Sequence, residues 1–254
     1  MEEVSFNSEG YPSPIHLAIV EAPHTRSIVN SINDISVGSL GIYEVAESGT
    51  SGTFPWTTSP LLNNVAPAGI SGNELTFSPP LYYPAGGHKV IFYGYYPRTT
   101  ATNGTSYITP PGNGTAPTFN VTLTGQEDIM HGASVAGGSY SPGTAIPITF
   151  KHKLTQIQLN VSALGTLLSS IKILNVRNTG SMNLETGAVT YGNNTVDITL
   201  DKAGLTTTAP VMVPADVPVY LVEVAFMGQL LPRKYLIRPT SGKFLEGVIY
   251  TVTL

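Results

Sequence analysis

Residues 150–161 read FKHKLTQIQLNV, and their alternation changes phase halfway along. The positions that suit a core form two sets of opposite parity: Phe150, His152 and Leu154, then Ile157, Leu159 and Val161. Side chains two residues apart share one face of a strand, so a single regular strand would bury only one set. Either a β-bulge near residues 155–156 or a strand that crosses between two sheets resolves the conflict. Both arrangements place His152 on the core side of the strand.

The composition of the whole chain agrees with an all-β protein. Its 254 residues correspond to one large domain or two small ones. Charged residues make up 11% of the chain, against about 25% in an average soluble protein. The frequent Thr, Val and Tyr residues favour strands, whereas the 26 Gly and 20 Pro residues favour turns. The apolar content of 41% is enough for ordinary cores and excludes wholesale disorder.

Strand-like runs recur between Pro/Gly/Asn turns at the spacing of a β-sandwich. The expected strands are residues 15–20, 35–45, 75–83, 89–96, 118–124, 146–161, 171–177, 196–200, 209–213, 218–227, 233–238 and 247–254. The one helical candidate is residues 162–170 (SALGTLLSS).

Two stretches have the composition of linkers. Residues 99–117 carry no charge, and residues 131–145 are mostly small and polar. The strand pattern restarts strongly after the second stretch, so we expect a boundary at 140–146. The sequence therefore predicts two domains, 1–145 and 146–254.

Charge is distributed unevenly along the chain. The net charge is −4 and the isoelectric point is near 5.7, which argues against a nucleic-acid partner bound through a basic face. Residues 1–88 hold eight acids and a single base, Arg26, whereas residues 89–254 hold eleven bases and eight acids.

The residues offer no constellation for catalysis, metal binding or cofactor binding. The five histidines are dispersed, and nucleotide-binding, zinc-protease and hydrolase motifs are missing. His152 fits a hydrogen-bonded core histidine better than a base or a ligand. The absence of Cys excludes thiolate chemistry and disulfides. We therefore expect no enzyme, no metal and no cofactor.

The sequence is compatible with two cellular locations. No apolar run reaches the roughly 18 residues of a membrane span, and the start at Met1 lacks the basic and apolar regions of a signal peptide. Either the protein is cytosolic or its export signal has been removed. The Thr-rich, weakly charged composition favours the second.

Tyrosines gather in the strand over residues 89–96. Tyr93, Tyr95 and Tyr96 could stack on the face of a sugar ring as ligand contacts. The competing explanation is that aromatic residues are common in strands and alternate between the two faces.

Arg26 is the only Lys or Arg in the first 88 residues. It follows the strand-like run 15–20 and Pro23, so we expect it in an exposed loop, where proteolysis concentrates. A trypsin-like protease would find one target in this region, although an ordinary surface arginine explains the residue equally well.

Several stretches, in order along nearly the whole chain, resemble the fimbrillin family, the subunits of type V fimbriae of Gram-negative anaerobes. Residues 150–161 resemble the F-x-H-x-L-x-x-[IL]-x-[VL]-x-V strand that opens the family's C-terminal half. The supporting stretches are 25–26 (TR) ahead of 33–35 (NDI), 92–97 (FYGYYP), 126–132 (QEDIMHG) and 242–254 (GKFLEGVIYTVTL).

The resemblance implies two transthyretin-like β-sandwich domains in tandem and a function in assembly. Family precursors are exported to the outer membrane as lipoproteins, and an arginine-specific or trypsin-like protease removes the first strand. Mapped here, residues 1–26 would leave, Ser27 would become the new N-terminus, and Ile15, Leu17 and Ile19 would fill the groove until cleavage. A strand of another fimbrial subunit would then occupy that groove by strand exchange.

Two departures from the family pattern refine this expectation. The lipid-bearing Cys is missing, and the chain stops at its own final strand without the donor extension of stalk subunits. The resemblance therefore implies a tip or accessory subunit of a cell-surface fimbria, active in adhesion, or a truncated stalk subunit. A host or bacterial glycan or protein would be its receptor. The alternative is a glycan-binding surface lipoprotein that does not polymerise and binds through the tyrosines.

Overall fold

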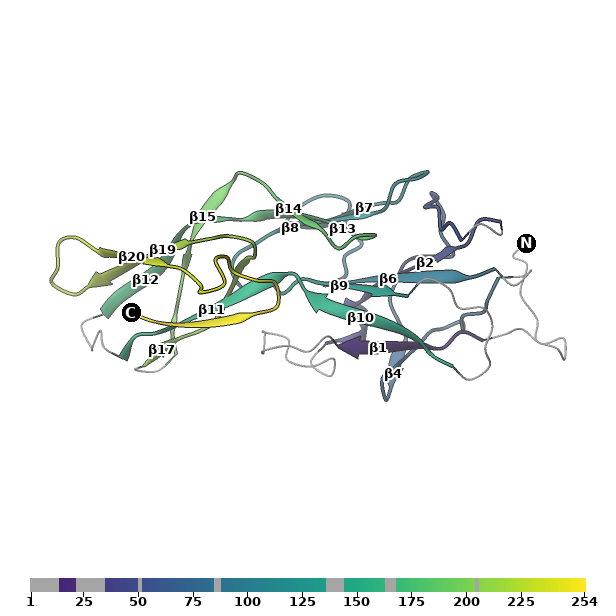
Figure 1. The fold of residues 1–254 in the computed structure, drawn as a ribbon, viewed down its shortest axis with the longest axis horizontal. Helices are drawn as coiled ribbons and strands as arrows, with labels where there is room; N and C mark the ends of the chain where they lie inside the picture. The colour runs from purple at the N-terminus through teal and green to yellow at the C-terminus, as the bar shows by residue number, and fades with distance from the viewer. Residues whose placement is uncertain are drawn as a thin grey trace.

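The computed structural model describes residues 14–21, 35–49, 52–84, 88–135, 144–162, 168–203 and 206–254. Across these residues the fold is all β, as the composition predicted, and the one helical element is the 3-10 turn η2 (Val37–Ser39). The molecule is elongated, with the early strands at one end and the late strands at the other (Figure 1). Within these ranges no helix has the length and apolar character needed to cross a membrane.

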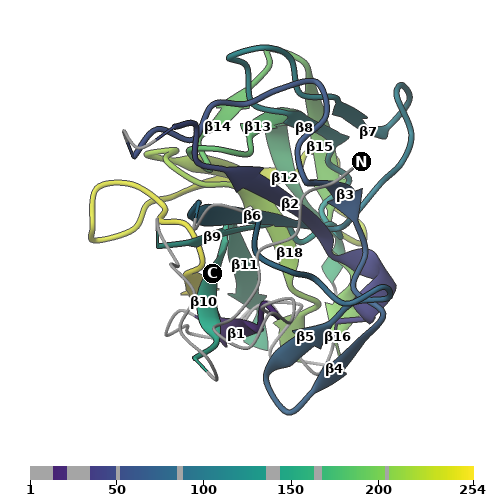
Figure 2. The same ribbon diagram turned by 90° about the vertical axis from the view of Figure 1, so that its right-hand side faces the viewer.

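The first third of the chain builds most of an eight-stranded sheet, ordered β3-β2-β6-β9-β10-β1-β5-β4. Its strands are β1 (Leu17–Glu21), β2 (Gly41–Ala46), β3 (Leu62–Val65), β4 (Gly69–Ser71), β5 (Glu74–Thr76), β6 (Val90–Tyr96), β9 (Met130–Ser134) and β10 (Ile146–His152). The side chains of six of these strands share one cluster, the N-terminal core, so the sheet curls around it (Figure 2). Its buried members are Ile15, Leu17, Ile19, Ile35, Leu40, Ile42, Leu75, Tyr83, Val90, Phe92, Met130, Ile146, Ile148 and Phe150.

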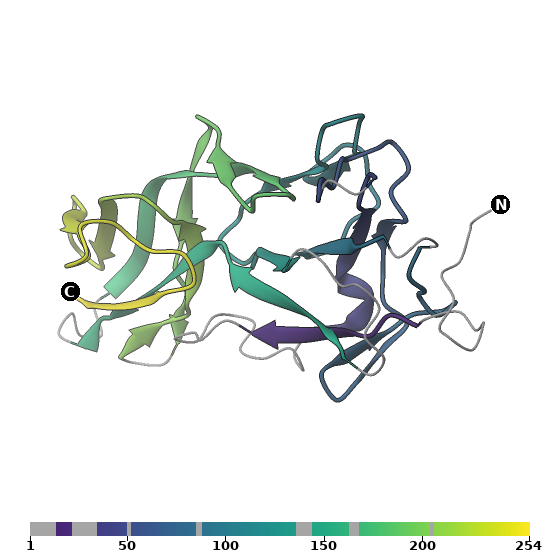
Figure 3. The ribbon, with the colours of Figure 1, turned by 45° about the vertical axis from the view of Figure 1, so that its right-hand side comes forward.

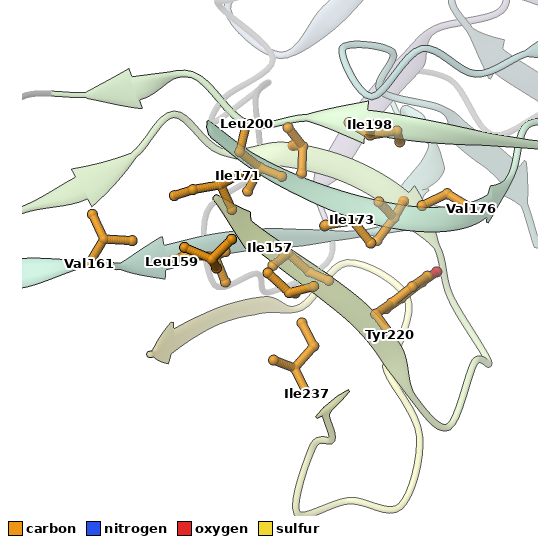
Figure 4. Close-up of a cluster of buried hydrophobic side chains, with 14 of the residues drawn as sticks. Ile157, Leu159, Val161, Ile171, Ile173, Val176, Ile198, Leu200, Tyr220 and Ile237 are labelled. Atoms are coloured by element: carbon orange, nitrogen blue, oxygen red, sulfur yellow. The ribbon is translucent and has the colours of Figure 1, made fainter. Parts of the chain in front are cut away.

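Two further sheets face each other at the opposite end as a sandwich. One contains β11 (Leu154–Asn160), β16 (Lys202–Ala203), β17 (Thr207–Thr208), β18 (Val211–Pro214) and β21 (Ile249–Thr253). The other contains β12 (Leu168–Arg177), β15 (Thr195–Thr199), β19 (Tyr220–Phe226) and β20 (Arg233–Ile237). Aliphatic side chains from both sheets fill the C-terminal core between them, among them Ile157, Ile173 and Ile237 (Figure 4).

A fourth sheet joins the two ends. It is ordered β14-β13-β8-β7 and contains β7 (Ser106–Thr109), β8 (Thr118–Thr122), β13 (Thr179–Asn183) and β14 (Val189–Tyr191). Its apolar side chains pack on the outer face of β2 and β6 in a third cluster, the junction core. The eight-stranded sheet is therefore buried on both faces along β2, where Ile42 belongs to the N-terminal core and Tyr43 to the junction core.

The phase change in residues 150–161 is a crossing between sheets, the second of the two predicted arrangements. β10 ends at His152, β11 begins at Leu154, and the two strands belong to different sheets. The break at Lys153 lies just ahead of the expected position at 155–156. Phe150 enters the N-terminal core, Leu154 the junction core and Ile157 the C-terminal core, so this stretch supplies all three.

Hydrogen-bonded strands cross the predicted boundary at 145/146 in two places. β10, which follows it, pairs with β9 and β1, which precede it. β8 pairs likewise with β13 of the later half. The division into domains 1–145 and 146–254 stays a prediction, with an extensive junction between the two halves.

The helix expected over residues 162–170 is wrong at its C-terminal end. Leu168 to Ser170 open β12, and Leu168 is buried in the C-terminal core. Residues 163–167 lie outside the described part of the chain.

Candidate functional site: strand β1 and its neighbours

Strand β1 lies inside the eight-stranded sheet, with a partner along each edge. It runs parallel to β10 over five residue pairs, from Leu17 opposite Ile146 to Glu21 opposite Phe150 (Figure 3). On its other edge it is antiparallel to β5, with Leu17 opposite Leu75. We call β1, β5, β10 and the residues 81–82 that pair ahead of β1 the β1 site. Its main-chain bonds make β1 an integral strand in this conformation.

Backbone hydrogen bonds extend beyond the strand itself. The amide of Ile15 donates to the carbonyl of Leu81 at 2.9 Å, and the amide of Ile19 donates to Asn73 at 2.8 Å. The amide of Ile146 donates to the carbonyl of His16 at 2.7 Å. Any strand that replaced β1 would have to satisfy these same partners, because buried backbone groups without partners are costly.

The side chains of the strand alternate as the sequence predicted. Ile15, Leu17 and Ile19 point into the N-terminal core with 8%, 0% and 5% of their surface exposed. On the opposite face His16 is exposed, with its Nδ1 atom 3.2 Å from Oε2 of Glu74, and Val20 is 40% exposed. Their role as a groove-filling strand that is later removed stays a prediction.

The three buried side chains account for a large share of a domain's stability. Burying an aliphatic side chain contributes about 1.5–3 kcal/mol, so three contribute about 5–9 kcal/mol. A domain is stable by about 5–15 kcal/mol in total. Removal of β1 would expose the N-terminal core and the edges of β5 and β10, and the domain would need a replacement strand.

Arg26 and Ser27, the predicted processing site, lie outside the described residues. In the sequence Arg26 follows the end of β1 at Glu21 by five positions, ahead of the next described residue, Ile35. Cleavage after Arg26 would therefore cut the chain between β1 and everything that follows it.

The predicted ligand-contacting tyrosines are mostly interior. Tyr93 and Tyr95 are 6% and 0% exposed, because β8 and its neighbours cover the outer face of β6. Burial raises the pKa of Tyr93 to about 12, and the Tyr95 hydroxyl donates to Oδ1 of Asn64 at 2.9 Å. Tyr96 packs against the N-terminal core and is partly exposed. Ligand contact by these residues stays a prediction, and the burial of Tyr93 and Tyr95 weighs against it.

His152 is a hydrogen-bonded core histidine, as its position in the strand favoured. Its Nδ1 atom lies 2.8 Å from Oδ1 of Asp128, and the two side chains are 4% and 2% exposed. This pair ties the start of the crossing strand to the segment ahead of β9. Among the described residues no group of three His, Asp or Glu side chains is arranged to hold a metal ion.

Sequence reasoning missed the other half of the β1 site. Strand β5 and residues 81–82 form one wall of it, and Ala18, also in β1, is 8% exposed. Alternation identifies the face that a strand buries but not its neighbours, so no local signal pairs Leu17 with Leu75.

Comparisons with known proteins agree with this fold. A crystal structure of a candidate cell adhesion protein from Bacteroides uniformis is similar, with a TM-score of 0.60 and 19% identity, covering 98% of this chain and 94% of that one. A candidate cell adhesion protein from Bacteroides ovatus gives a TM-score of 0.56 and 16% identity, over 95% and 92% of the two chains.

A fimbrial protein from Bacteroides ovatus gives a TM-score of 0.50 and 12% identity, over 96% of this chain and 49% of that one. At these identities the likeness concerns the fold. No curated protein sequence matches the chain. The sequence model of the fimbrillin-like family matches residues 25–254, nearly the whole sequence. The chain therefore belongs to the fimbrillin-like family.

Proposed function

We propose that the protein is a structural, non-enzymatic subunit of a cell-surface fimbria that assembles by exchange of strand β1. The family supports a fimbrial or adhesin-like subunit that interacts with other fimbrial subunits. The observation that carries the finer proposal is the β1 site. An N-terminal strand there fills a core through three alternating side chains, and Arg26 follows it in the sequence.

The β1 site specifies the strand that would replace β1. A donor must run parallel to β10 and antiparallel to β5, as β1 does. It must present apolar side chains at three alternating positions and accept the amide of Ile146. These are the requirements of β-augmentation, in which main-chain bonds provide affinity and alternating pockets provide specificity.

The rest of the proposal concerns processing and position in the fibre. An arginine-specific or trypsin-like protease cleaves after Arg26, Ser27 becomes the new N-terminus, and residues 1–26 leave. Export as a lipoprotein precursor to the outer membrane precedes this step. The proposal also includes a tip or accessory position in the fimbria and a role in adhesion.

The experiment is digestion of the folded chain with an arginine-specific protease, followed by native mass spectrometry. We expect one early cut, after Arg26, and then a population of residues 27–254 that forms higher oligomers or binds a donor peptide. The control is Arg26→Gln, which should stay intact and monomeric under the same conditions. A folded wild-type chain that resists cleavage at Arg26, or one that is cut and keeps residues 1–26 indefinitely, would contradict the proposal.

A further inference from the structure

The fourth sheet, β14-β13-β8-β7, has one apolar face and one polar, uncharged face. Its apolar face packs into the junction core through residues such as Ile108, Phe119 and Met182. Because side chains alternate along a strand, the residues between these point away from that core. In all four strands those outward residues are threonine, serine, asparagine or tyrosine. The outer face of this sheet therefore presents hydroxyl and amide groups and no charge.

One row of outward side chains crosses all four strands. Tyr107 of β7 lies opposite Asn120 of β8. Asn120 lies opposite Ser181 of β13, and Ser181 lies opposite Thr190 of β14. Residues opposite each other on one face have Cβ atoms about 4.5–5.5 Å apart, so the row is continuous. We call these four residues the polar row. It places an aromatic ring at one edge, followed by an amide and two hydroxyl groups.

A hollow of about 380 Å³ lies along the polar row. All four residues of the row line it, and the loop ahead of β7 contributes Gly104 and Thr105. Every residue that lines the hollow is uncharged. Sites for small ligands usually have volumes of about 300–1,000 Å³, so this hollow has room for a small ring.

The amide of Asn120 is held in place by its neighbours. Its Nδ2 atom donates to Oγ1 of Thr109 and to the carbonyl oxygen of Thr118, each at 3.2 Å. These bonds use the two donors of the amide and leave its Oδ1 atom as an acceptor. A side chain that is already ordered loses little conformational entropy when a ligand binds. Asn120 is therefore a preformed acceptor in the middle of the hollow's lining.

We propose that the polar row binds a neutral carbohydrate, with one sugar ring of a glycan in the hollow. Sugar hydroxyl groups donate and accept hydrogen bonds, as do the side chains of Asn120, Ser181 and Thr190. The apolar face of the sugar ring stacks on Tyr107, whose ring is apolar and whose tip is polar. The uncharged lining offers no charge-assisted hydrogen bond to a phosphate, sulfate or carboxylate group.

This site is separate from the other candidate sites of the molecule. Tyr93 and Tyr95 are buried under the inner face of the fourth sheet, whereas Tyr107 lies on its outer face. Figures 1 and 2 both show the fourth sheet and β1 on opposite sides of β2 and β6. The inference deepens the adhesion role in the proposed function, on which it rests for its purpose, by naming the chemistry of the receptor. Binding itself requires no cleavage at Arg26.

The test is a titration of the intact, isotope-labelled chain, followed by the NMR shifts of its amides. The neutral probes are maltohexaose, cellohexaose, mannotriose and N-acetyllactosamine, and a heparin tetrasaccharide is the charged probe. We expect at least one neutral probe to shift the amides of Asn120 and Ser181 along a saturating curve, and the heparin probe to leave them unchanged. The series extends to about 10 mM, beyond the range of weak specific binding.

Variants identify the side chains that make the contact. Tyr107→Ala should weaken binding of the neutral probe about tenfold or more, because aromatic contacts carry much of the free energy of a small interface. Tyr107→Phe keeps the ring and should keep most of the affinity. Ser181→Gln fills the hollow and should abolish binding. Tyr82→Ala is the matched control, since Tyr82 is 40% exposed and lies outside the fourth sheet. The amide spectrum of each variant shows whether its fold is intact.

Several results would overturn the proposal. They are the absence of saturating shifts at the polar row with every neutral probe, stronger binding of the heparin probe, and equal affinity in Tyr107→Ala and the wild type. Shifts centred on Tyr82 or Tyr96 in place of the polar row would place the glycan elsewhere and would also contradict it. No protease or donor peptide is present, so failure here leaves the exchange of β1 to its own experiment.

Discussion

At the scale of single residues, the β1 site rests on a few fully buried side chains. Leu17 has no exposed surface and lies between Ile146 and Leu75 on the neighbouring strands. The sequence could predict which residues of this strand are buried, because alternation is a local signal. It could not predict that Tyr93 and Tyr95 are interior, because a sheet built from both halves of the chain covers them.

Leu17→Ala should destabilise the protein by about 2–5 kcal/mol, since it leaves a cavity in the N-terminal core. Val20→Ala, on the exposed face of the same strand, should cost less than about 0.5 kcal/mol. Urea unfolding of the two variants and the wild type measures the difference. Equal losses would mean that β1 does not fill the core as described.

Gly132 and Gly94 face each other on neighbouring strands under the ring of Phe150. A Cβ atom at Gly132 would lie 2.9 Å from that ring, so Gly132→Ala should destabilise by about 1–3 kcal/mol. Phe150→Leu in the same chain should recover part of this loss, because it shortens the side chain that the new methyl group meets. A double-mutant cycle in urea measures the coupling, and strictly additive losses would contradict this packing.

The partly buried His131 makes the stability of the folded protein depend on pH. Burial lowers its pKa below the usual value, and its Nε2 atom lies 2.9 Å from the carbonyl oxygen of Leu184. The unfolded chain therefore takes up a proton at a higher pH than the folded one, so stability is retained above the unfolded pKa and lost as pH falls below it. The free energy of unfolding between pH 7 and pH 5 should have a smaller slope in His131→Gln than in the wild type. Identical slopes would show that His131 does not contribute to the pH dependence of stability.

At the scale of secondary-structure elements, long alternating strands were predictable and short ones were not. The runs that become β1, β6, β10 with β11, and β21 alternate strongly in the sequence. Strands β3, β4 and β14 have three or four residues and no fully buried position, so their sequences carry little signal. The pairing of β8 with β13 joins distant segments, and strand alternation does not identify partners.

Hydrogen exchange at individual amides should show which strands lose protection when β1 leaves. The amide of Ile146 is bonded to His16 in the intact chain, so it should exchange faster once residues 1–26 have left. Amides of β12 and β19 lie in the other sandwich and should keep their protection. Unchanged protection at Ile146 after complete removal of residues 1–26 would contradict the assigned place of β1.

At the scale of the whole molecule, three cores are connected through one crossing stretch, residues 150–161. Composition was enough to predict an all-β fold, and the motifs along the chain were enough to predict the family. The sheet that joins the two ends could not be predicted from them, because it depends on contacts between distant segments. No residue of β1 belongs to the C-terminal core. We therefore predict that the C-terminal sandwich keeps its structure when β1 leaves.

The exchange of β1 is tested most directly by native mass spectrometry of the cleaved chain with a synthetic peptide of residues 14–21 (PIHLAIVE). We predict that the peptide displaces residues 1–26 and gives a one-to-one complex with residues 27–254, whereas the peptide with Leu17→Asp does not bind. Retention of residues 1–26 against excess peptide, or equal binding of both peptides, would contradict the account.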